Sequence, residues 1–150
     1  MKKLMMLLAV MMTAEATWAQ DVKIEFFTPS IVHIVKGQPT KTLVVTAKPE
    51  QVAVKQQGNV WSSSELTVKQ DPKSGTLTFL TAKGRVLLRE KDCNVAEARQ
   101  TFTLDKDEAI YGLGTIQNGK MNRRGEKKRM EQSNLEDFQS VLQSIKGWGL

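Results

Sequence analysis

Residues 66–104 have the sequence LTVKQDPKSGTLTFLTAKGRVLLREKDCNVAEARQTFTL. Apolar side chains recur here at every second position, as in Leu77 and Phe79, and this spacing is typical of half-buried β-strands. The runs are separated by DPKSG (71–75) and AKG (82–84), which contain residues that favour tight turns. The segment TLTFL-TAKG-RVLLRE therefore predicts a β-hairpin.

The same alternation extends outward from this stretch to residue 22. The predicted strands centre on these apolar groups: Val22, Ile24 and Phe26; Val32 and Ile34; Leu43 and Val45; Val52 and Val54; Leu66 and Val68; Leu77 and Phe79; Val86 and Leu88; Phe102 and Leu104. Turn residues separate the groups, as in QQGN (56–59). Only Val95–Arg99 and Leu135–Ile145 are compatible with a helix, and the second is equally compatible with a strand. A strand about every ten residues predicts an all-β fold, an antiparallel β-sandwich or barrel.

Composition limits the class of protein. The chain has 150 residues, 40% hydrophobic and 25% charged, which suits one ordinary soluble domain. A single cysteine, Cys93, cannot form an internal disulfide, and a single histidine, His33, cannot build a His-rich metal site. We therefore predict no metal and no cofactor, and we expect Cys93 to be an inert thiol.

The N-terminus has the organisation of a secretory signal. Two lysines precede the apolar run 4–12, and the small residues Thr17 and Ala19 follow in the pattern of a cleavage site. The apolar run is well short of the roughly 20 residues needed to span a bilayer. We expect residues 1–19 to be a signal peptide and residues 20–150 to form one exported domain, periplasmic or secreted, without a membrane span after signal removal.

Positive charge is concentrated in residues 119–130, GKMNRRGEKKRM, where six Lys or Arg side chains accompany one glutamate. Such a patch can bind polyanions because each neutralised phosphate releases counterions. The alternative, which we favour, is a solvated loop or hairpin whose charges keep an edge from aggregating. No aromatic side chain within the segment could stack on a base. We therefore expect no nucleic-acid partner.

Two short motifs place an aromatic residue next to glycines. Tyr111 precedes Gly112 and Gly114 in YGLG, and Trp148 lies between two glycines in KGWGL (146–150). Glycine allows a strand to bend sharply or another backbone to come close. Neither motif is a phosphate-binding loop, because no GK[ST] follows. Each motif alone predicts a bent strand.

In their order and separation, these motifs closely resemble the N-terminal β-sandwich of family 31 glycoside hydrolases, especially the bacterial α-xylosidase and α-glucosidase branch. The resemblance is strongest over residues 105–150, through E-x-I-YGLG, NG-x-MN-x-RG, QSN and S-x-KGWGL. Two positions depart from the family pattern. Thr115 stands where an acid or amide is usual after GLG, and Trp148 stands where a tyrosine is usual.

The resemblance implies a galactose-mutarotase-like sandwich that precedes a (β/α)8 catalytic barrel. In the family, the aspartate nucleophile and the carboxylic acid donor of retaining hydrolysis lie on that barrel, whereas this chain stops at Leu150. We therefore expect a chain truncated before the barrel, with no catalytic residue and no activity alone. The family's sandwich sends a loop toward the barrel mouth, and the matching positions predict that Asn134 and Asp137 bind a sugar hydroxyl. The alternative is that both residues only turn or solvate the chain.

Three function classes remain open at this point. The first is a non-catalytic module of an exported family 31 α-glycosidase acting on α-xylosides or α-glucosides, whose partners are the catalytic barrel and an α-linked oligosaccharide. The second is a stand-alone carbohydrate-binding sandwich, in which Trp61 could offer an aromatic platform, although a half-buried strand residue is the better interpretation. The third is a surface protein that binds acidic polymers through residues 119–130.

Overall fold

The computed structural model describes residues 22–38, 46–134 and 136–150. These residues form ten β-strands and no helix, and so contain no helix able to cross a membrane. The predicted all-β antiparallel fold is therefore confirmed. The predicted signal peptide and the predicted strand at Leu43 and Val45 lie outside the described residues.

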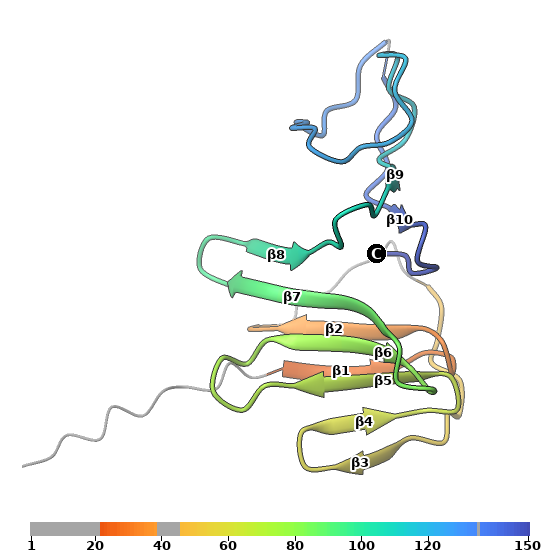
Figure 1. The fold of residues 1–150 in the computed structure, drawn as a ribbon, viewed down its shortest axis with the longest axis vertical. Coiled ribbons are helices and arrows are strands. Elements are labelled where there is room, and N and C mark those ends of the chain that lie inside the picture. Colours follow the sequence, from red (N-terminus) through yellow and green to blue (C-terminus); the bar gives the residue numbers. More distant parts are fainter. Residues whose placement is uncertain (1–21, 39–45, 135) are drawn as a thin grey trace, which may run out of the picture.

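The largest sheet has six strands in chain order: β3 (Lys55–Gln57), β4 (Val60–Ser62), β5 (Leu66–Gln70), β6 (Leu77–Thr81), β7 (Val86–Asn94) and β8 (Arg99–Thr103) (Figure 1). Every neighbouring pair is antiparallel. The tight turns carry the predicted residues. In the β5–β6 turn, hydrogen bonds from the backbone N–H groups of Ser74 and Lys73 hold the pKa of Asp71 below its ordinary value.

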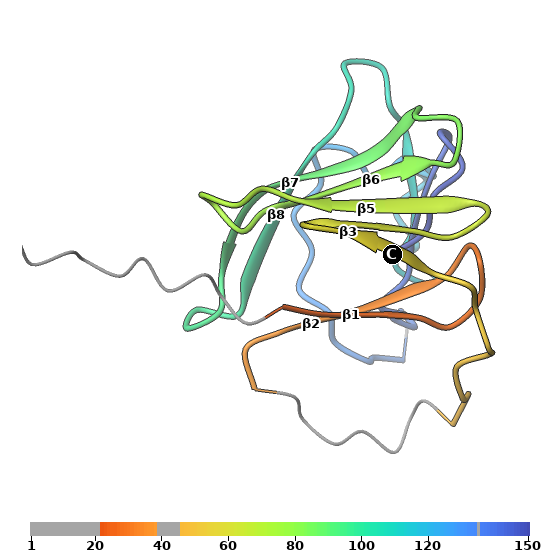
Figure 2. The same ribbon diagram turned by 90° about the horizontal axis from the view of Figure 1, so that it is seen from below.

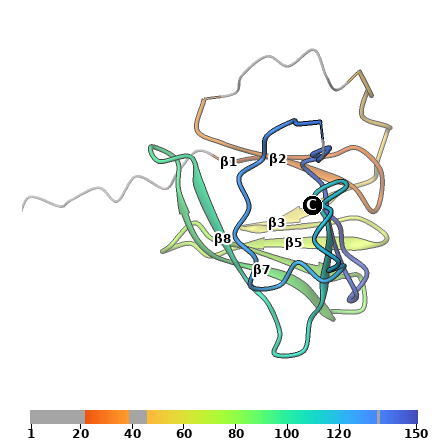
Figure 3. The same cartoon turned by 90° about the horizontal axis from the view of Figure 1, so that it is seen from above.

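A second layer consists of the antiparallel hairpin β1 (Val22–Phe26) and β2 (Val32–Lys36). This hairpin lies against one face of the six-stranded sheet (Figures 2 and 3). In both views the β7–β8 end of the sheet curls toward the hairpin. The two layers make the sandwich that the alternating sequence predicts.

The apolar core lies between the layers. Its buried members are Phe26 from β1, Leu66 and Val68 from β5, and Leu77 from β6. Val68 is 0% exposed and Leu77 is 1% exposed. Burial of a Leu or Val side chain contributes about 1.5–3 kcal/mol. The half-buried ring of Trp61 packs against this core, which confirms its interpretation as a strand aromatic.

A buried ion pair ties the layers together. The Nζ atom of Lys36, at the end of β2, donates to the carboxylate of Glu90 in β7, whose side chain is fully buried. Glu90 also accepts from Gln100 Nε2 and from the backbone N–H of Leu77, each at 2.8 Å. A buried carboxylate needs several such hydrogen-bond and charge partners, because an unpaired buried charge is strongly destabilising.

The chain after β8 forms a separate two-stranded sheet, β9 (Ile110–Gly112) paired with β10 (Leu142–Ser144). Between these strands the chain makes a long excursion, residues 113–141, which we call the arm. Figure 1 shows the arm extending away from the two layers.

Two local predictions are wrong, and one is confirmed. Val52 and Val54 are outside any strand, although Val52 still packs against the core. The predicted QQGN turn is confirmed, since it contains the turn of the β3–β4 hairpin, where Gly58 has φ 55°. Residues 95–98, compatible with a helix by sequence, form the β7–β8 turn.

The helix alternative for Leu135–Ile145 is also wrong over the residues described. The strand alternative holds for Leu142–Ser144 only. The preceding residues of this segment belong to the arm, which is held by isolated contacts rather than by a continuous ladder.

Candidate functional site

The base of the arm depends on two glycines with left-handed backbones. Gly112 has φ 114° and Gly114 has φ 81°. A Cβ atom on Gly112 would lie 2.2 Å from the carbonyl oxygen of Val141, and one on Gly114 would lie 1.9 Å from that of Asp137. Both glycines thus let the returning chain approach closely, which confirms the interpretation of YGLG as a bent strand beside another backbone.

Polar contacts order the arm. Thr115 and Asp137 form an isolated antiparallel bridge, with N···O distances of 2.8 and 3.2 Å. Further out, the side-chain amide of Gln132 both donates to the carbonyl of Phe138 and accepts from its N–H, each at 3.2 Å. These contacts order the arm, although its described residues, 113–134 and 136–141, contain no strand.

A buried carboxylate, Glu108, joins the segments at the foot of the arm. It is 3% exposed. Its Oε1 accepts from the hydroxyl of Ser144 and, at 2.8 Å, from the indole N–H of Trp148, and its Oε2 accepts from the backbone N–H of Asp105 at 2.9 Å. The guanidinium of Arg124 donates to the carbonyls of Asp105 and Glu108 at 2.7 and 2.9 Å. We call these residues the Glu108 cluster.

The electrostatics of the Glu108 cluster favour ionised carboxylates. Burial alone raises the pKa of Glu108, but the hydrogen bonds from Ser144, Asp105 N–H and Trp148 outweigh it, so the pKa lies below its ordinary value. The hydrogen bond and charge of Lys146, whose Nζ lies 2.8 Å from the Asp105 carboxylate, lower the pKa of Asp105 as well. Both carboxylates thus accept hydrogen bonds in their ionised form and join the segment before β9 to residues 144–148.

The two predicted sugar-binding residues lie on the arm. Asn134 is in the turn closed by the hydrogen bond from Ser133 N to Glu136 O, and Asp137 follows that turn and pairs with Thr115 through its backbone. Both side chains are exposed, and within the described residues neither makes a hydrogen bond. The arrangement leaves an amide and a carboxylate available on one short stretch of the arm. Their role in binding a sugar stays a prediction.

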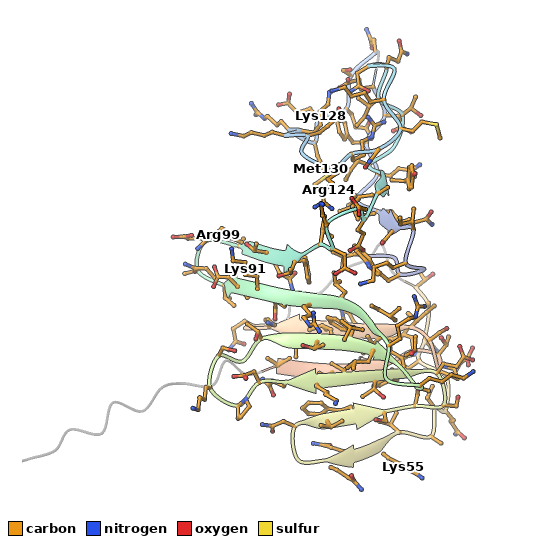
Figure 4. The ribbon with its side chains drawn as sticks, viewed as in Figure 1. Lys55, Lys91, Arg99, Arg124, Lys128 and Met130 are labelled. Carbon is orange, nitrogen blue, oxygen red and sulfur yellow. The ribbon has the colours of Figure 1, made fainter. Side chains whose placement is uncertain are left out.

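The basic segment is a loop of the arm that is mostly exposed, although the Arg123 side chain is only 8% exposed, and much of its charge is paired. Lys120 and Arg123 pair with Glu126, Lys128 with Glu136, and Arg129 with Glu131. Figure 4 shows Lys128 and Met130 on the arm and Lys55 at the opposite end of the molecule. The interpretation as a solvated loop fits this geometry better than an open polyanion site, because the pairing leaves less free positive charge than the sequence suggests.

Sequence reasoning missed the two buried glutamates. Glu90 lies two positions after Leu88, so both side chains point to the same, inward face of the strand. A charged residue at an inward position was the sequence signal for a buried glutamate. Glu108 opens the E-x-I-YGLG motif, and Ser144 and Trp148 belong to S-x-KGWGL. The structure thus explains the two motifs jointly, since Glu108 in the first accepts from both residues of the second.

Among solved structures, the chain is similar to the GH31 alpha-xylosidase from Xanthomonas citri, with a TM-score of 0.72 and 22% sequence identity over 90% of this chain. The chain spans 17% of the length of that solved chain. No protein-family model and no curated protein matches the chain. The chain therefore has the fold of a part of a family 31 enzyme, as the sequence resemblance implied.

Proposed function

We propose that this protein is a non-catalytic β-sandwich module of an exported family 31 α-glycosidase acting on α-xylosides or α-glucosides. The module would support a catalytic (β/α)8 barrel and contribute the arm to the substrate site. The observation that carries the proposal is the similarity to the α-xylosidase over 90% of this chain. The Glu108 cluster adds support, since it unites the two motifs on which the sequence resemblance rests.

The two buried glutamates of the described residues, Glu90 and Glu108, fit a supporting rather than a catalytic role. Retaining hydrolysis needs one ionised nucleophile and one protonated acid about 5 Å apart. Glu90 and Glu108 are each engaged by several donors inside the fold. Catalysis would therefore come from a partner barrel, and the chain alone would be inactive.

The coding DNA downstream of Leu150 gives the first test. We expect an open continuation that encodes a barrel. The extended protein should hydrolyse p-nitrophenyl α-D-xyloside or α-D-glucoside, whereas the 150-residue chain should show no turnover. An immediate stop codon together with turnover by the short chain would overturn the proposal.

The contribution of the arm is tested in the extended enzyme. Replacing Asn134 or Asp137 by Ala should raise KM for the glycoside about tenfold, because a lost hydrogen bond to substrate costs about 1.4 kcal/mol. Gln139→Ala is the matched control on the same exposed stretch and should leave KM unchanged. If all three variants keep the parent KM, Asn134 and Asp137 only turn and solvate the chain.

Export is tested by mass spectrometry of the secreted or periplasmic protein. Cleavage after Ala19 would leave Gln20 as the first residue. An intact Met1 on the exported product, or a product that stays in the membrane, would contradict the predicted signal peptide.

A further inference from the structure

An apolar groove remains open between the two layers at the β7–β8 end of the sandwich. It has a volume of about 870 Å³ and is lined by β2, β7, β8 and residues 147–150. Its walls include Leu66, Phe79 and Leu88 from the large sheet and Ile34 from the hairpin, together with Trp148. Leu66 and Leu88 are already buried, whereas Phe79, Ile34 and Trp148 are half-buried and would be covered by a further apolar layer in a closed sandwich.

The groove also has a polar floor. Lys36 and Gln100, which hold the buried Glu90, both line it. An ammonium group has three donors and an amide has an acceptor oxygen besides its donors. The Lys36 side chain is 8% exposed and its Nζ is bound to Glu90, so the amide oxygen of Gln100 is the group of this floor that can accept from a peptide N–H.

One wall of the groove is a sheet edge. β8 is the terminal strand of the six-stranded sheet, and its residues Gln100 and Phe102 line the groove. In the described residues, β7 is the partner strand of β8. An exposed edge of this kind is a template for a further strand, because its outward N–H and C=O groups can continue the ladder.

We propose that the groove is an interaction surface for an extended polypeptide strand that pairs with β8 and inserts alternate apolar side chains between the layers. This inference rests on the proposed function, since the remainder of the glycosidase would supply the strand. The similar α-xylosidase chain is far longer, as this chain spans 17% of it. A polypeptide occupant uses the free edge, the apolar walls and the polar floor together, whereas a small apolar ligand would use the walls alone.

The test measures backbone amide exchange in β8 on the 150-residue chain. The probe is an acetylated and amidated peptide of alternating Val and Lys, whose positive charge avoids simple attraction to a chain of net charge +6. We expect saturating peptide to slow exchange of the Arg99–Thr103 amides at least tenfold. A peptide of the same composition, with all valines at one end, should give no protection.

Variants locate the binding surface. Phe102→Lys places a charge in the groove and should abolish the protection, whereas Thr103→Lys, on an exposed residue of the same strand outside the groove, should not. Ile31→Lys provides a second groove variant at a position that is 57% exposed, so its fold does not depend on the native side chain. It should weaken binding in the same direction.

Two outcomes would overturn the proposal. One is an unchanged exchange rate in β8 at every concentration of the alternating peptide. The other is binding of dodecanoate to the groove without protection of β8, together with no effect of the peptide, which would identify a small-molecule cavity. Neither outcome bears on glycoside hydrolysis by the extended chain, so a failure here is distinguishable from failure of the proposed function.

Discussion

In the six-stranded sheet, each strand pairs with its neighbour in sequence and the inward side chains meet in an apolar core. In the arm, residues 113–141, order comes from two glycines, a single backbone bridge and side chains that bond to main chain. The sheet would lose stability gradually with each methyl group removed. In the arm, the closest approaches are at Gly112 (next to its first residue) and Gly114, where any side chain would meet the returning backbone. The part of the chain to which we assign the substrate-facing role is therefore ordered differently from the sheet, through glycines and isolated hydrogen bonds rather than an apolar core.

The largest effect should come from the core. Leu77→Ala removes a fully buried side chain of the sheet and should lower the free energy of unfolding by about 2–5 kcal/mol. Urea denaturation followed by circular dichroism measures it. The matched control is Ile145→Ala beside the base of the arm, which is 60% exposed and should change stability by less than about 0.5 kcal/mol. If both variants lowered the free energy of unfolding equally, the apolar core of the sheet would not be the main source of stability.

The next effect should come from the foot of the arm. Gly114→Ala would place a methyl group against the carbonyl of Asp137 and strain a left-handed backbone, at a cost of about 1–3 kcal/mol. Limited proteolysis should then cleave the arm well before the sheet. Gly119→Ala is the control: Gly119 has a similar φ of 70°, but a Cβ there would lie in open space. The control therefore measures the cost of the left-handed backbone without a steric clash. If both variants resist protease equally, close approach at Gly114 is not what orders the arm.

A smaller, pH-dependent effect should come from the Glu108 cluster. Because folding lowers the pKa of Glu108, its ionised form stabilises the protein above the unfolded-state value near 4.5, and this contribution is lost as pH falls through the folded-state pKa. The unfolding free energy of Glu108→Gln should therefore vary less with pH below about 4.5 than that of the parent. Parallel pH profiles for the two proteins would contradict this assignment. Asp71 and Asp105 are unchanged in both, so their contributions cancel.

The smallest effect should come from the basic segment. Because most of its cations are paired, we expect weak heparin retention that falls steeply with salt. Serine at Arg123, Arg124, Lys127, Lys128 and Arg129 should abolish the retention. Tight binding that survives physiological salt would instead favour a polyanion-binding surface protein.

The difference between the regions also governs what the sequence could predict. Strands such as β5 and β6 alternate apolar and polar residues, so periodicity located them. The strand β3 was not predicted, because its sequence KQQ is exposed throughout and contains no apolar residue whose spacing could indicate a strand. Its identity depends on the turn at Gly58 and on Trp61 packing against the core.

In the arm, local sequence identified the glycines but not their partners. The contact between Gly114 and Asp137 joins residues far apart in the chain, and no local pattern encodes such a pairing. Asn134 and Asp137 were named through a family resemblance, and the structure adds their exposure and the turn that holds them. Glu108 belongs to a recognisable motif, but the sequence does not predict its burial, which depends on contacts with Ser144 and Trp148 far along the chain.

The single thiol of the chain has a practical consequence. Cys93 is half-buried, free and part of the groove wall, and the sequence holds no other cysteine. A polarity-sensitive fluorophore attached there would therefore report from one known position without any mutagenesis. Its emission should shift to shorter wavelength when an apolar segment displaces water around the dye. The protein thus carries its own labelling position for spectroscopy at the surface where the layers stay open.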